Sequence, residues 1–131
     1  MKLLFSLSFL LLFIACSSDD PFADCQYGRP QPVFSSTTPQ VVHHAFGIRA
    51  LQGIEQVQFA NDMKLELIQK GCDDIIQEFT FELPGQFESQ ETAFWIKQAL
   101  EQFRYLSQLD EQYADLEMWV QAIGAVAAEI K

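Results

Sequence analysis

Basic residues are scarce in this chain of 131 residues. Eight lysines and arginines stand against 18 aspartates and glutamates, which gives a formal net charge of −10. The basic residues are also scattered along the sequence rather than clustered. A field of this sign repels phosphate backbones. The composition therefore argues against nucleic-acid binding and favours a neutral or basic protein partner.

Residues with strong metal-binding or catalytic chemistry are few as well. The two histidines, His43 and His44, are adjacent, so they point in different directions on a helix or a strand and do not converge on one metal ion. No zinc, calcium, phosphate-loop or nucleophile-elbow spacing occurs. We expect the acidic pair Asp73 and Asp74 to be solvated in a turn rather than catalytic. The sequence thus predicts no catalytic, cofactor-binding or metal-binding residue.

Long apolar runs are confined to the N-terminus. Lys2 is followed by an apolar run over residues 3–14, which is too short to span a bilayer as a stable helix and is typical of a signal peptide. The run ends at Ala15 and Cys16. This pair resembles the lipobox of bacterial lipoproteins, in which a small residue precedes a cysteine that is diacylated and becomes the mature N-terminus. The resemblance covers the leader, residues 1–15, and not the domain.

The resemblance implies a lipid-anchored protein of a bacterial cell envelope. Two acyl chains on Cys16, palmitate among them, would hold the protein stably, because one chain is marginal and each buried methylene contributes about 0.8 kcal/mol. The following residues, 17–20, differ from an aspartate-based inner-membrane retention signal and are similar to a surface-export tether. We therefore expect an outer-membrane lipoprotein, with the cell surface as one option for its exposed side.

Residues 16–38 are rich in Pro, Ser and Thr and keep no regular period, which predicts an irregular tether. Cys25 lies in this tether, and Cys72 is the other cysteine that remains once Cys16 carries lipid. An exported chain folds in an oxidising compartment, and two remaining thiols make an even count. We predict a disulfide between Cys25 and Cys72. A metal or redox site is the weaker alternative, because the two cysteines lack CxxC spacing.

Residues 54–83 alternate in polarity with a period of two. Apolar residues occupy odd positions: Val57, Phe59, Met63, Leu65, Leu67, Ile75, Phe79, Phe81 and Leu83. Their even neighbours are mostly polar: Gln58, Lys64, Glu66, Glu78, Thr80 and Glu82. This pattern predicts an antiparallel meander with one buried and one wet face.

The turns of this meander set its expected register. A turn at Asn61 places Val57 opposite Leu65. A three-residue turn over residues 70–72, with Gly71 supplying positive φ, places Leu67 opposite Ile75. Both turns keep odd residues facing odd residues, as burial of one face requires.

Residues 39–53 allow two interpretations. Thr38 is a good helix start and Gly53 a plausible stop. The β-branched pair Val41 and Val42 opposes a helix, and the stretch could instead form a strand that leads into the meander. Helix and strand both stay open from the sequence.

The C-terminal part of the chain changes to helical spacing. Apolar residues recur in two series: Ala93, Ile96, Leu100, Phe103 and Leu106, then Tyr113, Leu116, Val120, Ile123, Ala127 and Ile130. Ser89 is the expected N-cap of the first helix. One continuous helix would be about 60 Å long, too long for so small a domain, so we predict a break near residues 107–110 with Asp110 capping the second helix. Trp95 and Trp119 should pack at the helix–sheet boundary, with an aromatic binding surface as the alternative.

These elements predict an α+β fold, a small antiparallel β-meander of three or four strands packed on one face by two C-terminal helices. The domain spans residues 39–131, after the signal peptide (1–15) and the lipidated cysteine with its tether (16–38). Ile68 and Ile76 are apolar exceptions on the wet face. They either pack under the tether or mark a contact with a partner.

The anchor, the acidity and the lack of a catalytic pattern favour a non-enzymatic, envelope-anchored domain. Its expected partners are the membrane, through the lipid, and a protein of the envelope or the extracellular space. A structural envelope lipoprotein is the first alternative. A carboxylate-dependent hydrolase of envelope glycans is the second, since catalytic residues can assemble in space without a sequence motif.

Overall fold

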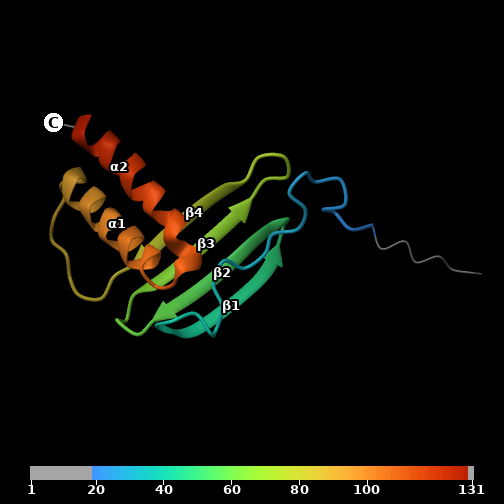
Figure 1. Ribbon diagram of the computed structural model, residues 1–131, viewed down its shortest axis with the longest axis horizontal. Coiled ribbons are helices and arrows are strands. Elements are labelled where there is room, and N and C mark those ends of the chain that lie inside the picture. Colours follow the sequence, from blue (N-terminus) through green and yellow to red (C-terminus); the bar gives the residue numbers. More distant parts are fainter. Residues whose placement is uncertain (1–18, 130–131) are drawn as a thin grey trace, which may run out of the picture.

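The computed structural model describes residues 19–129, so the predicted signal peptide and Cys16 lie outside the described residues. The elements in chain order are β1 (Val41–Arg49), β2 (Gln52–Phe59), β3 (Lys64–Lys70), β4 (Ile76–Glu82), α1 (Thr92–Ser107), the 3₁₀ helix η1 (Glu111–Leu116) and α2 (Glu117–Glu129). The strands form one antiparallel sheet in the order β1-β2-β3-β4 (Figure 1). The predicted α+β meander with C-terminal helices is confirmed.

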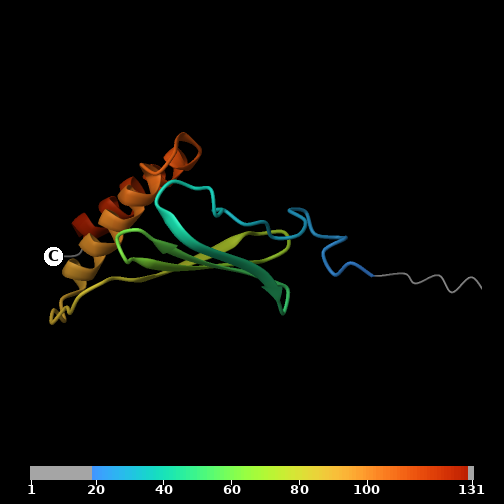
Figure 2. The ribbon, with the colours of Figure 1, turned by 90° about the horizontal axis from the view of Figure 1, so that it is seen from below.

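One face of the sheet carries both covering layers. Figure 2 shows the helices over one end of this face and the cyan part of the N-terminal segment, which leads into β1, over the other end, while the blue part extends beyond the sheet. The core between them consists of Phe34, Val57, Phe59, Met63, Leu65, Leu67, Leu106 and Tyr113. Odd residues of β2 and β3 supply much of it, as the period of two predicted. The fold therefore buries one sheet face under two separate parts of the chain.

The first hairpin of the meander has the predicted register, and the second does not. Val57 lies opposite Leu65 as expected. In the second hairpin Leu67 lies opposite Phe79, because the connection takes residues 71–75 instead of three residues. The slip is by an even number of residues, so the buried parity survives. Ile75, predicted to be buried, falls in the loop and is 52% exposed.

Residues 41–49 form a strand, so the helical interpretation of residues 39–53 is wrong. The register of β1 against β2 shifts between Val41 and His43, which is a β-bulge. Beyond the bulge the parity inverts, so that His44 lies opposite Val57. Even residues of β1 therefore point to the same side as odd residues of β2, which a single parity along the sequence could not indicate.

The break between the helices is confirmed, and the predicted helix start is not. Asp110 caps η1, its side chain accepting a hydrogen bond from the backbone N–H of Gln112 at 3.2 Å. Helix α1 begins at Thr92, with Glu91 at the N-cap position. Ser89 instead holds the approach to the helix, since its Oγ accepts from the N–H of Glu91 and its carbonyl accepts from Nε1 of Trp95, each at 3.2 Å.

Residues 19–40 contain no helix or strand, yet they are attached to the sheet through a buried carboxylate. The side chain of Glu55 on β2 is fully buried. Its Oε2 accepts from the N–H of Val33, and its Oε1 accepts from the N–H of Phe34 and from Nε2 of His44, each at 2.8 Å. Three hydrogen bonds offset the free-energy cost of burying this carboxylate. They also satisfy two backbone N–H groups that have no partner in the β-sheet.

The same segment is fixed further along by aromatic and hydroxyl groups. The ring of Phe34 stacks on Tyr113 with centroids 5.0 Å apart. The hydroxyl of Tyr113 hydrogen-bonds Thr38 at 2.9 Å and donates to the carbonyl of Val33 at 3.3 Å. Gln69 on β3 donates to the carbonyl of Gln31 at 2.7 Å. The segment thus covers the part of the core that the helices leave open.

This position corrects the expectation for Ile68 and Ile76. Both are even residues, whereas residues 19–40 lie on the side of the odd residues Glu55 and Gln69. The tether therefore cannot cover them, and Ile76 is 51% exposed.

The β1–β2 turn offers a test of backbone strain. Ala50 and Leu51 have φ of 48° and 63°, and Leu51 is 54% exposed. Two successive positive φ values define a type I′ turn, for which Asn-Gly is preferred. We expect Ala50→Asn/Leu51→Gly to raise the free energy of unfolding by about 1 kcal/mol, measured by urea denaturation. An unchanged or lower stability would contradict this turn conformation.

The buried carboxylate gives a second prediction. Glu55→Gln keeps the shape but places an amide N–H₂ against donors, so we expect a loss of roughly 2–4 kcal/mol in unfolding free energy. The matched control is Glu66→Gln on the exposed side of the sheet, for which we expect a change under about 1 kcal/mol. Equal effects of the two substitutions would show that Glu55 does not hold the N-terminal segment.

Candidate functional site: the outer face of the sheet

The candidate site lies on the sheet face opposite the helices. We call this surface the outer face; it consists of the even residues of β2, β3 and β4 and of the odd residues of β1 beyond the bulge. None of the described helices covers it in Figure 2. Its residues are mostly polar because the period of two sends every second side chain to this side. The outer face is therefore a solvent-facing surface on a rigid support.

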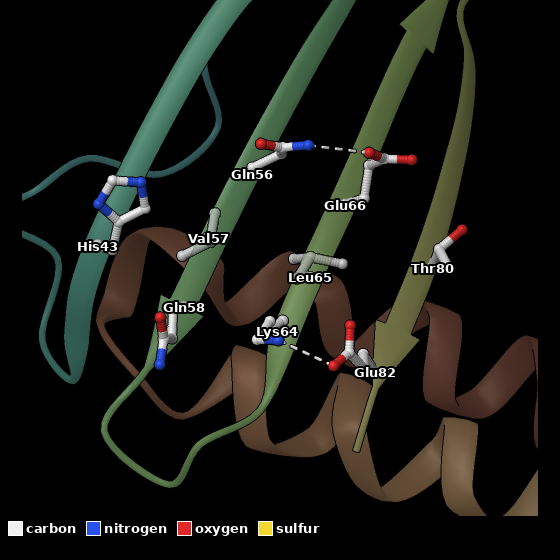
Figure 3. A pocket seen from close by; sticks show the side chains of 9 residues that line it. All are labelled: His43, Gln56, Val57, Gln58, Lys64, Leu65, Glu66, Thr80 and Glu82. Carbon is white, nitrogen blue, oxygen red and sulfur yellow. Dashed lines mark hydrogen bonds and ion pairs between the residues drawn. The ribbon is translucent and has the colours of Figure 1, made fainter. Parts of the chain in front are cut away.

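A hollow of about 370 Å³ occupies the half of the outer face nearest the β2–β3 turn. Its lining comes from all four strands (Figure 3): His43, Gln56, Val57, Gln58, Lys64, Leu65, Glu66, Thr80 and Glu82. A second hollow of about 360 Å³ extends along β1 and β2 to Arg49. The two share Gln56 and Glu66, so they form one continuous depression across the sheet.

Cross-strand pairs order the polar groups of this depression. Nζ of Lys64 donates to Oε1 of Glu82 at 2.9 Å, across directly opposed positions of β3 and β4. Nε2 of Gln56 donates to Oε2 of Glu66 at 3.2 Å, as Figure 3 also shows. Such exposed pairs stabilise a sheet by about 0.2–1 kcal/mol each. They leave amide, hydroxyl and carboxylate oxygen atoms facing solvent, an arrangement suited to hydrogen-bonded recognition.

The apolar exceptions predicted on this face are present, at its other end. Ile68 lies directly opposite Ile54 on β2, and both are half-buried. Ile76 lies opposite Lys70 and is exposed. A contact of Ile68 and Ile76 with a partner stays a prediction.

The other residues singled out from the sequence take separate places. His43 lines the hollow of the outer face while His44 binds Glu55 on the covered face, so the two diverge as expected. Asp73 lies in the β3–β4 loop, where its Oδ1 accepts from the N–H of Gln26 at 3.4 Å. Among residues 19–129, no group of three or more His, Cys, Asp or Glu side chains is placed to hold a metal ion.

Cys25 and Cys72 form a disulfide, with their Cα atoms 4.7 Å apart. The bond joins the N-terminal segment to the β3–β4 loop, and the N–H of Tyr27 donates to the carbonyl of Cys72 at 3.3 Å. Gly71 enables this loop, since its φ is 108° and a Cβ there would lie 1.7 Å from the carbonyl oxygen of Asp74.

Two residues that hold the fold were not identified from the sequence. Glu55 and Gln69 occupy odd positions in the meander, where every strand neighbour of the same parity in β2 and β3 beyond Gly53 is apolar. A polar residue on the buried parity was the available signal. It indicates that something other than a helix, here the backbone of residues 31–34, covers that part of the sheet.

Comparison of the chain with protein-family models finds no match, and comparisons with curated proteins and with solved structures find none either. Within residues 19–129, no helix has the length and apolar character needed to cross a membrane.

The disulfide gives a third prediction. Cys25→Ser/Cys72→Ser should lower the unfolding free energy by about 4 kcal/mol, because the bond closes a loop with a sequence separation of 47. Urea denaturation of the parent with and without reductant supplies the matched comparison. Two thiols that alkylate freely in the unreduced, denatured parent would contradict the bond.

Proposed function

We propose that the protein is a lipid-anchored component of a bacterial cell envelope that binds a protein partner through the outer face. The observation that carries the proposal is the apolar run of residues 3–14 followed by Ala15 and Cys16. A signal of this kind exports the chain and fixes it to a membrane surface through two acyl chains. An anchored domain of this size suits a subunit, receptor or inhibitor that meets its partner at the envelope.

The disulfide supports export independently of the leader. Disulfides persist in oxidising compartments and are rare in the cytosol. The bond joins Cys25, nine residues after the proposed lipidated Cys16, to Cys72 in the loop between β3 and β4. Nine residues span at most about 30 Å when fully extended. An acylated Cys16 would therefore hold the domain close to the membrane, and the β3–β4 loop would be the part of the sheet joined to the anchor by the shortest covalent path.

Binding fits the outer face better than catalysis does. Its carboxylates are engaged with neighbours: Glu82 with Lys64, Glu66 with Gln56, and Glu78 with Lys70. A general acid or base needs a carboxyl group free to reach substrate with a suitably shifted pKa. A structural role in the envelope is the closest alternative, because it needs the anchor and not the outer face.

The anchor is tested first. Labelled palmitate should be incorporated into the parent in bacterial cells, and the processed protein should partition into the detergent phase. Cys16→Ser should abolish labelling and leave unprocessed precursor. A mature parent with a free amine on any residue other than Cys16 would overturn the lipoprotein proposal.

Partner binding is tested with the intact processed protein in native envelopes. Thr80→Arg places a bulky cation in the hollow, and Thr92→Arg makes the same change at an exposed site at the start of α1. We expect cross-linking to one envelope protein by the parent and by Thr92→Arg, and its loss in Thr80→Arg. Cross-linking that neither substitution changes would exclude the outer face. Turnover of envelope glycans that is lost in Asp73→Asn/Asp74→Asn/Glu78→Gln would favour the hydrolase alternative.

A further inference from the structure

Strand β4 is a free edge of the sheet. It pairs with β3 on one side, and it is the last strand in the sheet order among the described residues. Five of its seven residues are exposed, and its core-side residues Phe79 and Phe81 are only half-buried. In an antiparallel pair, alternate residues of such a strand direct N–H and C=O groups outward, where they can pair with another strand. The core is thus incomplete at this edge.

The opposite edge, β1, is irregular at its start. Its register shifts at a β-bulge between Val41 and His43 and is regular from His43 to Arg49, and a bulge disrupts the row of backbone groups at its own position. The β3–β4 register runs from Lys64–Glu82 to Lys70–Ile76 without a shift. Strand β4 is therefore the edge strand that pairs without a shift over its whole length.

A cleft of about 340 Å³ lies between β4 and α1. Its lining consists of Phe81, Leu83, Phe87, Trp95, Gln98, Ala99 and Gln102. The four helical residues follow one face of α1 at helical spacing. Figure 1 shows α1 at the β4 side of the sheet, so side chains from a strand added to β4 would enter this cleft. The free edge of β4 thus lies beside a cleft that can accept alternate side chains of an added strand.

The cleft has aromatic walls that are held in place before any ligand arrives. Trp95 is 44% exposed and Phe87 is 41% exposed, with ring centroids 5.8 Å apart. Phe94 packs against Trp95 at 5.1 Å, and the indole N–H donates to the carbonyl of Ser89. Fixed aromatic surface binds apolar side chains at a small cost in conformational entropy.

The acidic residues near β4 indicate which kind of strand could bind there. Residues 76–91 contain Glu78, Glu82, Glu88 and Glu91, and neither lysine nor arginine. A second copy of the chain paired edge to edge would bring these carboxylates together, which is unfavourable. A strand with lysine or arginine on its outward side would instead place cations near Glu78 and Glu82 on the outer face, where each carboxylate pairs through Oε1 with one lysine of β3 and stays about half exposed or more.

We propose that β4 and the α1–β4 cleft form a strand-acceptor site for an extended segment of a partner protein. That segment has apolar residues at alternate positions, which enter the cleft, and lysine or arginine at the others. The inference rests on the proposed function, since it specifies which partner segment the anchored domain recognises, and it extends the outer face by one strand.

The test uses the intact processed protein and a synthetic nine-residue peptide that alternates valine with lysine, capped at both ends. Binding is measured by isothermal calorimetry, with a scrambled peptide of equal composition and a valine–glutamate peptide as controls. Two further peptides carry N-methyl groups on either the odd or the even residues. An added strand directs alternate N–H groups to β4, so one methylated phase should lose roughly tenfold or more in affinity and the other should retain binding. Equal behaviour of the two phases, or equal binding of the scrambled peptide, would overturn the proposal.

Protein variants locate the site. Trp95→Ala should weaken the peptide roughly tenfold, whereas Trp119→Ala, a tryptophan of similar exposure (48%) on α2, should not. Glu88→Lys/Glu91→Lys, on exposed residues, should weaken binding at low salt with an unchanged thermal midpoint. Loss of binding in Trp119→Ala as well as in Trp95→Ala would refute the cleft as the site.

Other outcomes separate this inference from the proposed function. A concentration-dependent dimer in sedimentation, lost in Trp95→Ala, would replace the peptide by a second copy of the chain. Cross-linking to an envelope protein without peptide binding would refute the strand-acceptor site and not the proposed function. An unacylated Cys16, together with peptide binding that depends on which residues are N-methylated, would refute the anchor and not the strand-acceptor site.

Discussion

The buried carboxylate of Glu55 joins three parts of the fold at one point. It lies on β2, accepts a hydrogen bond from His44 on β1, and accepts two from the backbone of residues 33 and 34. Without it, the N–H groups of Val33 and Phe34 would lie against the sheet with no acceptor, at a cost of about 1–3 kcal/mol each. The position of Phe34 in the core therefore depends on a polar residue. Phe34 in turn fills the part of the core that the helices do not cover.

This division of the covering layer explains where the molecule exposes binding surface. The helices cover one end of the sheet and pack close to β4, and the N-terminal segment covers the other end (Figure 2). The outer face stays open because both layers lie on one side. The edge at β4 stays open because α1 lines a cleft there instead of closing it. Trp95 lines this cleft and Trp119 lies on α2, and both are nearly half exposed, so neither is fully packed at the helix–sheet boundary where both were expected.

The sequence predicted the parts of the fold that follow from regular periodicity. One parity through residues 54–83 was enough to assign β2, β3 and β4 to one sheet and to separate the covered face from the outer face, where Gln56, Glu66 and Thr80 lie. Asp110 marked the helix break because its side chain can satisfy an N–H at the start of η1.

The predictions that were wrong concern irregular backbone. Its causes are contacts with other parts of the chain, which the local sequence does not reveal. The five-residue loop after β3 forms around the disulfide to Cys25, so its length could not follow from Gly71 alone. The bulge in β1 inverts the parity, so the strand pattern of residues 43–49 does not continue the parity of residues 54–83. The α1–β4 cleft combines the end of β4 with the next element along the chain, but the connection over residues 83–91 has no regular period from which the position of α1 beside β4 could be predicted.

The disulfide has a mechanical consequence for a protein held by its N-terminus. A pulling force on residue 19 would enter the sheet at Cys72 through the covalent bond, and it would not peel residues 26–40 from the core. The load would then act on the loop end of the β3–β4 hairpin, and the hydrogen bonds of Glu55 would lie outside the force path. Reduction of the bond would move the load to those hydrogen bonds, so the redox state of two cysteines determines which part of the domain yields first.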